Sequence, residues 1–173
     1  MPDAIDPLPP LVIRADDVPV THWKNGGGTT RDLMVDAPNW RWRISLADID
    51  RDGPFSPYPG VERWFAVVEG AGVELTVDGI ASVIKPHDPA LWFDGERAPS
   101  CRLLDGPTRD LNLLLRADLG VRGVMRRAGA GVIWSEDWPL RGHFDMATRT
   151  LAWNLPPGPL PPRGVGYWIG VAP

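Results

Sequence analysis

The feature that most constrains the fold is how often proline, glycine and aspartate interrupt the apolar segments. The 173 residues include 20 prolines and 19 glycines, and no convincing helix beyond a turn or two fits between them. The apolar segments are short β-type runs at 11–13, 63–68, 73–77, 81–84, 90–93, 101–104 and 111–115. Many short strands at regular spacing are typical of a sandwich or barrel. The sequence therefore predicts an all-β protein.

Residues 40–49 show how such a strand is divided between two faces. Apolar Trp40, Trp42, Ile44 and Leu46 alternate with Arg41, Arg43, Ser45 and Ala47, so the first set predicts a face buried in a core. On the other face, Arg43 and Ser45 stand where exposed Lys and Glu would be commoner, which favours a pocket lining. Farther on, runs 63–68 and 73–77 flank a glycine-containing turn and predict a hairpin.

The last third of the chain carries weaker β signals, at 120–134, 150–155 and 166–171. Between the last two lies the proline-rich stretch 156–162. It fits either a polyproline ligand for a partner domain or, as we favour, a stiff connector between two strands, because an apolar strand follows directly.

Charge and cysteine usage limit the environment and the partners. The formal net charge is −4 and the arginines are scattered among acids, so we expect neither nucleic acid nor a membrane surface as partner. Cys101 is the single cysteine and excludes an internal disulfide. Residues 1–10 are acidic and proline-rich, unlike a targeting sequence, and no apolar run is long enough to span a bilayer. These features predict a soluble, cytoplasmic protein. The sequence leaves a homodimer open and does not decide the oligomeric state.

One polar stretch resembles a binding loop. Three consecutive glycines allow positive φ angles and close approach of another group, at an entropic cost. The spacing fits neither a P-loop nor a dinucleotide fingerprint, and a strand follows instead of a helix. The stretch predicts either a small-anion site or merely a turn. Its candidate ligand-binding residues are Trp23, Lys24, Asn25, Gly26, Gly27, Gly28, Thr29 and Thr30.

Several blocks of this sequence resemble known proteins. Segments 64–79 and 84–95 are similar to the hairpin and second motif of a cupin. In addition, blocks 23–31, 42–48, 53–63, 93–95 and 106–112 resemble, in order, those of the HutD/Ves family, with Tyr58 as a small departure where Phe is usual. The resemblance covers residues 20–116 well and 117–173 loosely.

This resemblance implies a bacterial, RmlC-like bicupin: a cupin-type double-stranded β-helix, or jelly roll, with a degenerate second half, forming one compact domain over residues 1–173. HutD members accompany histidine-utilisation enzymes and are thought to govern that pathway, whereas Ves members are described as stress- or cold-induced. The residues do not decide between the two branches.

The usual metal ligands of cupins are absent from this sequence. Aligned on Gly70, the glutamate position becomes Arg63, and the histidine positions fall on Pro57 and Pro59 or on Ser56 and Tyr58. The last histidine position becomes Ala98. An arginine repels a divalent cation and attracts a carboxylate, so we expect no metal and no cofactor, and an anion site in their place.

Strand parity groups further candidate residues. Asp110 and Asn112 share one strand face while Leu111, Leu113 and Leu115 take the other. If the polar faces point into a barrel, the ligand-binding set includes Arg43, Ser45, Arg63, Asp110 and Asn112. The alternative is that Arg43 and Asp110 form only an internal ion pair.

The sequence supports two kinds of function. The first is a non-enzymatic bicupin that senses a small carboxylate such as urocanate, formiminoglutamate, formylglutamate or formate. The second is a metal-free isomerase or epimerase, with His22 or Asp110 as base and Lys24 or Tyr58 as acid. The absence of a clear acid/base pair favours the first and predicts no catalytic residues. Ser45, His22 and Asp48 could also be combined into the catalytic triad of a hydrolase, but the sequence contains no G-x-S-x-G nucleophile elbow to support it.

Overall fold

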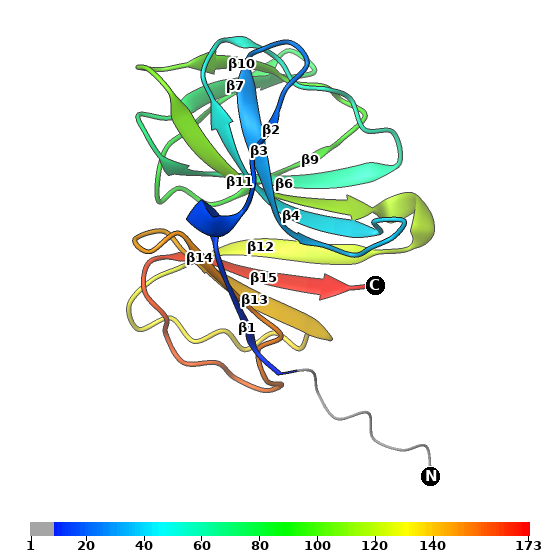
Figure 1. Cartoon of the computed structure of the whole chain (residues 1–173), viewed down its shortest axis with the longest axis vertical. Helices are drawn as coiled ribbons and strands as arrows, with labels where there is room; N and C mark the ends of the chain where they lie inside the picture. The colour runs from blue at the N-terminus through cyan, green and yellow to red at the C-terminus, as the bar shows by residue number, and fades with distance from the viewer. Residues whose placement is uncertain (1–8) are drawn as a thin grey trace.

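The computed structural model describes residues 9–173, which form three antiparallel sheets (Figure 1). Helical structure among them is confined to two three-residue 3-10 turns, η1 (Ala15–Asp17) and η2 (Ala117–Leu119). The predicted all-β fold is thereby confirmed. None of the helices in this part of the chain has the length and apolar character needed to cross a membrane.

The large sheet has six strands in the order β2-β3-β4-β11-β6-β9. Their bounds are β2 (Thr21–His22), β3 (Gly28–Val35), β4 (Trp42–Ile49), β11 (Thr108–Arg116), β6 (Val61–Glu69) and β9 (Leu91–Asp94). The small sheet has four strands in the order β5-β10-β7-β8: β5 (Gly53–Pro54), β10 (Ser100–Leu103), β7 (Val73–Val77) and β8 (Ile80–Ile84).

The pairing of β6 and β7 corrects one sequence prediction. The runs 63–68 and 73–77 do not form a hairpin, because β6 pairs with β11 and β9 whereas β7 pairs with β10 and β8. Gly70 and Gly72, with φ of 96° and 107°, turn the chain from one sheet into the other. An added Cβ at Gly72 would lie 2.4 Å from the carbonyl oxygen of Ile84, so only glycine fits this crossing.

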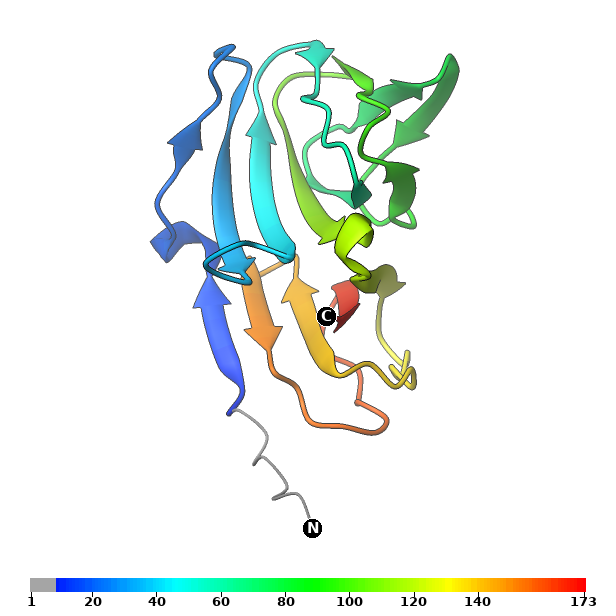
Figure 2. The same cartoon turned by 90° about the vertical axis from the view of Figure 1, so that its right-hand side faces the viewer.

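The C-terminal sheet has the order β1-β14-β13-β15-β12 and lies beyond one end of the large sheet (Figures 1 and 2). Its strands are β1 (Leu11–Arg14), β14 (Thr150–Trp153), β13 (Leu140–Asp145), β15 (Gly166–Ala172) and β12 (Arg122–Ala128). The N-terminal strand β1 thus belongs to the sheet built by the last third of the chain, pairing with β14 from Leu11↔Trp153 to Arg14↔Thr150.

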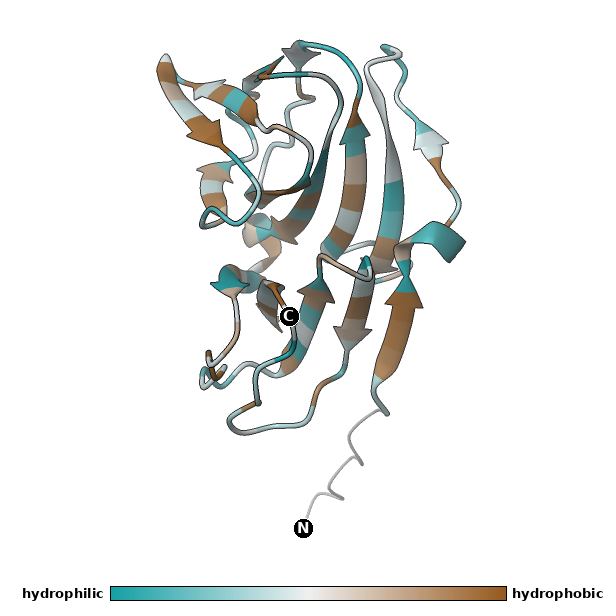
Figure 3. Cartoon of the chain, turned by 90° about the vertical axis from the view of Figure 1, so that its left-hand side faces the viewer, coloured by the Kyte–Doolittle hydropathy of each residue, from teal (hydrophilic) through white to brown (hydrophobic). Residues whose placement is uncertain are grey.

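One hydrophobic core joins the large and C-terminal sheets. Trp42, Ile44 and Leu46 from β4 pack in the same cluster as Trp153 and Ile169 from the C-terminal sheet. The rings of Trp42 and Trp153 lie 5.1 Å apart. Trp42, Ile44 and Leu46 of the predicted apolar face are therefore buried by sheet-on-sheet packing, whereas Trp40 lies half-buried in the turn before β4. Alternating bands of hydropathy run along the central strands (Figure 3).

A second core lies between the large and small sheets. It contains Ile49, Phe65 and Val67 from the large sheet and Val73 and Leu75 from the small one. Because side chains alternate along β4, β6 and β11, the residues between those of the shared core face this interior. Toward one end of the interior the apolar side chains give way to polar ones, and a cavity opens there.

Candidate functional site

The cavity is built from the polar face of four neighbouring strands in the large sheet. Across the sheet, Asp32 lies opposite Ser45, Ser45 opposite Asn112, and Asn112 opposite Phe65. The adjacent row runs from Thr30 through Ala47 and Asp110 to Val67. In the row on the other side, Leu114 lies between Arg43 and Arg63. Strand register therefore brings these polar residues together from four segments of the sequence.

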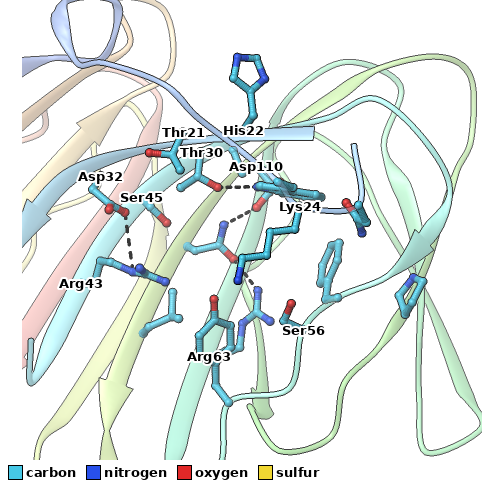
Figure 4. Close-up of a pocket in the computed structure, with 18 residues that line it drawn as sticks. Thr21, His22, Lys24, Thr30, Asp32, Arg43, Ser45, Ser56, Arg63 and Asp110 are labelled. Atoms are coloured by element: carbon cyan, nitrogen blue, oxygen red, sulfur yellow. Dashed lines mark hydrogen bonds and ion pairs between the residues drawn. The ribbon is translucent and has the colours of Figure 1, made fainter. Parts of the chain in front are cut away.

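The cavity has a volume of about 490 Å³, within the usual size of a small-molecule site. Residues 21–25 line one wall; Pro54 at the end of β5 and Phe55, Ser56 and Tyr58 from the loop that follows contribute another part of the lining. Figure 4 shows Lys24 extending toward Arg63, while His22 points away from the other labelled side chains. The other acid and base candidates of the isomerase hypothesis, Asp110, Lys24 and Tyr58, also line the cavity.

Arg63 is the buried cation of this site, with 6% of its surface exposed. Its Nη2 donates to Oδ1 of Asn112 over 3.2 Å, and its Cζ lies 5.2 to 5.6 Å from the ring centroids of Phe93, Phe55 and Tyr58. Nε and Nη1 have no hydrogen-bond partner among the described residues. The rings thus surround a guanidinium whose hydrogen-bonding capacity is only partly used by the described residues.

Asp110 is the buried acid beside it. Burial raises the pKa of its carboxyl to about 7, although the hydrogen bond from Asn112 and the charge of Arg63 oppose that rise. Nδ2 of Asn112 donates to Oδ2 of Asp110, while Oδ1 has no partner within residues 9–173. Burial also lowers the pKa of Arg63, but the guanidinium stays charged.

The ion pair between Arg43 and Asp110, which the sequence offered as the alternative to ligand binding, does not form among the described residues. Arg43 instead lies 3.7 Å from Asp32 across β3 and β4, and its Cζ is 5.1 Å from the ring of Trp40 and 5.9 Å from that of Tyr58. Sequence reasoning missed Asp32 as a site residue, because its partner Arg43 lies on a different strand and the pairing of β3 with β4 is not encoded by a local pattern. Asp110 therefore remains available to the cavity.

The three glycines form a turn, which the sequence left open as the alternative to an anion site. Trp23, Lys24 and Asn25 line the cavity, whereas Gly26, Gly27 and Gly28 do not. Gly26, at φ 68°, completes a turn between β2 and β3, in which Gly27 N–H donates to Oδ1 of Asn25. A Cβ at Gly28 would lie 2.1 Å from the carbonyl oxygen of Asp48, so this glycine permits close packing of two strands.

Thr29 and Thr30 illustrate how strand parity separates neighbours. Thr30 lines the cavity and accepts a hydrogen bond of 2.7 Å from Nε1 of Trp23. Thr29 points to the opposite face, where its hydroxyl lies 3.4 Å from Asp48. Asp48 is held there by Arg31 and Arg109 at 2.9 and 2.6 Å. The Ser45–His22–Asp48 triad is therefore not assembled, because Ser45 and Asp48 lie on opposite faces of β4.

The structure also tests the other reactive groups noted in the sequence. Burial raises the pKa of the Cys101 thiol to about 12, so this cysteine is a structural group in the core. Within residues 9–173, no three His, Cys, Asp or Glu side chains form a group that could hold a metal ion.

Comparison with known proteins identifies the family. The HutD family model matches residues 15–131, and the Ves protein of Citrobacter koseri is 37% identical over 152 residues, covering 79% of each chain. The chain belongs to the HutD/Ves family. A protein of 21.2 kDa from the hutC 3′ region of Pseudomonas putida is 43% identical over 108 residues. That match covers 60% of this chain but only 56% of the relative.

Solved structures agree with this family assignment. HutD from Pseudomonas fluorescens SBW25 superposes with a TM-score of 0.83 at 28% identity, covering 95% of this HutD/Ves chain and 98% of the other. The cupin domain of Schizosaccharomyces pombe Cnp3 has a TM-score of 0.50 at 13% identity, over 61% of this chain and 73% of that domain. The second likeness concerns the fold alone and supports the predicted cupin-type jelly roll.

Proposed function

We propose that this HutD/Ves protein is a non-enzymatic receptor for a small carboxylate metabolite and acts as a regulator or sensor linked to histidine utilisation or to stress. The observation that carries the proposal is Arg63, a buried guanidinium with two unpartnered nitrogens among the described residues, at the edge of a 490 Å³ cavity. Arg63 forms no hydrogen-bonded ion pair with a described carboxylate, and a buried guanidinium left in that state is costly. A ligand carboxylate would supply both a negative charge and hydrogen-bond acceptors.

The remaining lining gives the cavity its selectivity for anions. Lys24 and Arg43 add two further positive charges, and Asp32 balances Arg43. Asp110, with a pKa of about 7, is largely protonated in slightly acidic solution and then adds no charge. The aromatic rings of Trp23, Phe55 and Tyr58 provide apolar surface for the rest of the ligand.

The candidate ligands are urocanate, formiminoglutamate, formylglutamate and formate. The Pseudomonas putida relative lies in a hutC region and the Pseudomonas fluorescens HutD structure is described in a formate condition. Both facts concern those proteins, and they motivate the choice of candidates for this one.

Calorimetric titration of the purified protein at pH 6.5 with each candidate tests the proposal. At least one carboxylate should bind with a dissociation constant in the micromolar to low millimolar range, and the matching neutral amide (formamide for formate) should bind at least tenfold more weakly. Binding of amide and carboxylate with equal affinity, or no binding of any candidate at millimolar concentration, would refute the anion pocket.

A second candidate function is acid/base catalysis, which the raised pKa of Asp110 favours. Asp110 would act as base and Lys24 or Tyr58 as acid in an isomerase or epimerase. The receptor and enzyme hypotheses are distinguished by incubating the carboxylate ligand with the protein in deuterium oxide and recording the proton NMR spectrum of the ligand. We expect the ligand to be recovered unchanged. The enzyme hypothesis would instead be established if deuterium were incorporated at the carbon beside the carboxylate and if this incorporation were lost in the Asp110→Asn variant.

A further inference from the structure

The C-terminal sheet has a second face, opposite the core that it shares with the large sheet. Two loops cover this face: the loop 129–139 between β12 and β13, and the proline-rich strap, residues 154–165, between β14 and β15. Trp134 of the first loop and Leu160 of the strap form an isolated β-bridge over it. The stretch 156–162 thus serves as the predicted connector between strands, and Leu160 anchors it in a small core.

Beneath these loops lie side-chain nitrogens that lack hydrogen-bond partners. Arg141 and His143 share one face of β13, and Trp168 lies opposite His143 on β15. The unpartnered atoms, within the described part of the chain, are Nη2 of Arg141, Nε2 of His143, and Nε1 of Trp134 and Trp168. Each of these residues is at most 3% exposed. Buried polar atoms without partners are rare in proteins, and four in one small core call for an explanation.

These side chains are neighbours rather than scattered groups. The Trp134 and Trp168 rings stack with centroids 6.0 Å apart, and the His143 ring lies 4.6 Å from that of Trp168. Arg141 precedes His143 by two residues on the same strand face. It lies opposite Gly170, where the Trp138 ring takes the space of a Cβ. Polar nitrogens therefore line one strip of this face.

Arg141 places a positive charge in this small core. Its Nη1 donates to the carbonyl oxygen of Gly158 in the strap, and it forms no ion pair with a described carboxylate. Burial lowers its pKa and the charge of Asp137 partly opposes this. Since a guanidinium does not lose its proton in a protein, the positive charge persists. A buried charge without an ion-pair partner is unfavourable, and an anion accepting from Nη2 would offset that cost.

The neighbouring groups specify the kind of acceptor. Arginine and the two indoles can only donate hydrogen bonds. Burial lowers the pKa of His143 to about 4, so it is neutral at pH 7 and brings no second charge. A cation among obligate donors excludes a metal ion and favours a small anion.

We propose that the C-terminal sheet contains a second anion site, in which Arg141, flanked by the Trp134, Trp168 and His143 nitrogens, binds a small monoanion beneath the strap. This site lies on a different sheet from the carboxylate cavity and does not depend on it. The prolines of the strap at 156, 157, 159, 161 and 162 have no backbone N–H and cannot reinforce its attachment. Local opening of the strap provides the path for the ion.

The second anion site is tested by measuring the thermal unfolding midpoint as a function of nitrate concentration. All proteins in this test carry Arg63→Met, so that the arginine of the carboxylate cavity does not contribute. Sodium nitrate replaces sodium gluconate at constant ionic strength. At a nitrate concentration ten times the dissociation constant, the unfolding midpoint should rise by about 4 °C. Adding Arg141→Gln should abolish the rise. The matched control Arg127→Gln, which removes an exposed arginine from β12 of the same sheet, should retain it.

Bromide localisation keeps the test decisive if Arg141→Gln fails to fold. Crystals of the unmodified protein grown with sodium bromide should show anomalous density within about 3.5 Å of the Arg141 guanidinium, the distance of a long hydrogen bond. An ordered water at that position without anomalous signal, or equal nitrate effects in the Arg141→Gln and Arg127→Gln proteins, would overturn the second site. Neither result bears on carboxylate binding at Arg63.

Discussion

Replacing Arg63 with methionine is the sharpest test of the carboxylate cavity. Methionine keeps an unbranched, apolar side chain among the rings of Phe55, Tyr58 and Phe93 but removes every nitrogen of the guanidinium. The lost interaction is a hydrogen bond from a charged donor to the ligand carboxylate. Such bonds contribute about 1.5 to 3 kcal/mol, so the affinity should fall roughly 10- to 150-fold.

The pH of this experiment matters because Arg63 and Asp110 interact. The Arg63 charge lowers the pKa of Asp110, so removing it drives that pKa further above 7. At pH 6 Asp110 is then mostly protonated in both proteins, and the loss of affinity reports the missing guanidinium alone. At pH 8 the parent protein carries an ionised Asp110 and the variant does not, which would mix two effects.

Isothermal titration at pH 6 with the tightest-binding carboxylate is the assay, with the thermal midpoint recorded to verify folding. Arg122→Met, which removes an exposed arginine from β12, should bind as the parent does. Lys24→Met should weaken binding by only about 0.5 to 1 kcal/mol, because the Lys24 side chain is exposed and its charge is screened. If folded Arg63→Met binds within threefold of the parent, the carboxylate does not contact Arg63 and the reasoning fails.

Further predictions concern protonation, packing and composition. Because Asp110 has a raised pKa of about 7, carboxylate affinity should fall as the pH rises from 6 to 8. The Asp110→Asn variant should lose most of this pH dependence. A variant whose affinity depends on pH as strongly as that of the parent would contradict the prediction. Gly28→Ala should lower the thermal midpoint by several degrees because its Cβ would meet the Asp48 carbonyl, whereas Gly129→Ala, with open space around it, should not. Elemental analysis of protein prepared without a metal-affinity tag should find less than a tenth of an equivalent of iron, manganese, nickel or zinc, and a full equivalent held by side chains would refute this. Far-UV circular dichroism should give a helical content well below a third, the average for globular domains.

The sequence by itself determined which side chains share a face. Alternation along residues 40–49 and 110–115 separates Arg43, Ser45, Asp110 and Asn112 from the apolar residues between them, and in the structure these four line one cavity. Such inferences succeed because the two-residue repeat of a strand is a local property of the backbone. The spacing of proline, glycine and aspartate between short apolar runs also predicts the all-β class without coordinates. The sequence blocks that resemble HutD/Ves proteins likewise point to the family.

Only the tertiary structure decided which strands are neighbours. It pairs β6 with β11 instead of β7, joins β1 to β14 across the length of the chain, and gives Arg43 the partner Asp32 instead of Asp110. It also assigns the three glycines to a turn and a close strand contact, and it buries Arg141 beneath the strap. The physical reason is that strand pairing and burial depend on how whole sheets pack against one another, which no local repeat in the sequence encodes.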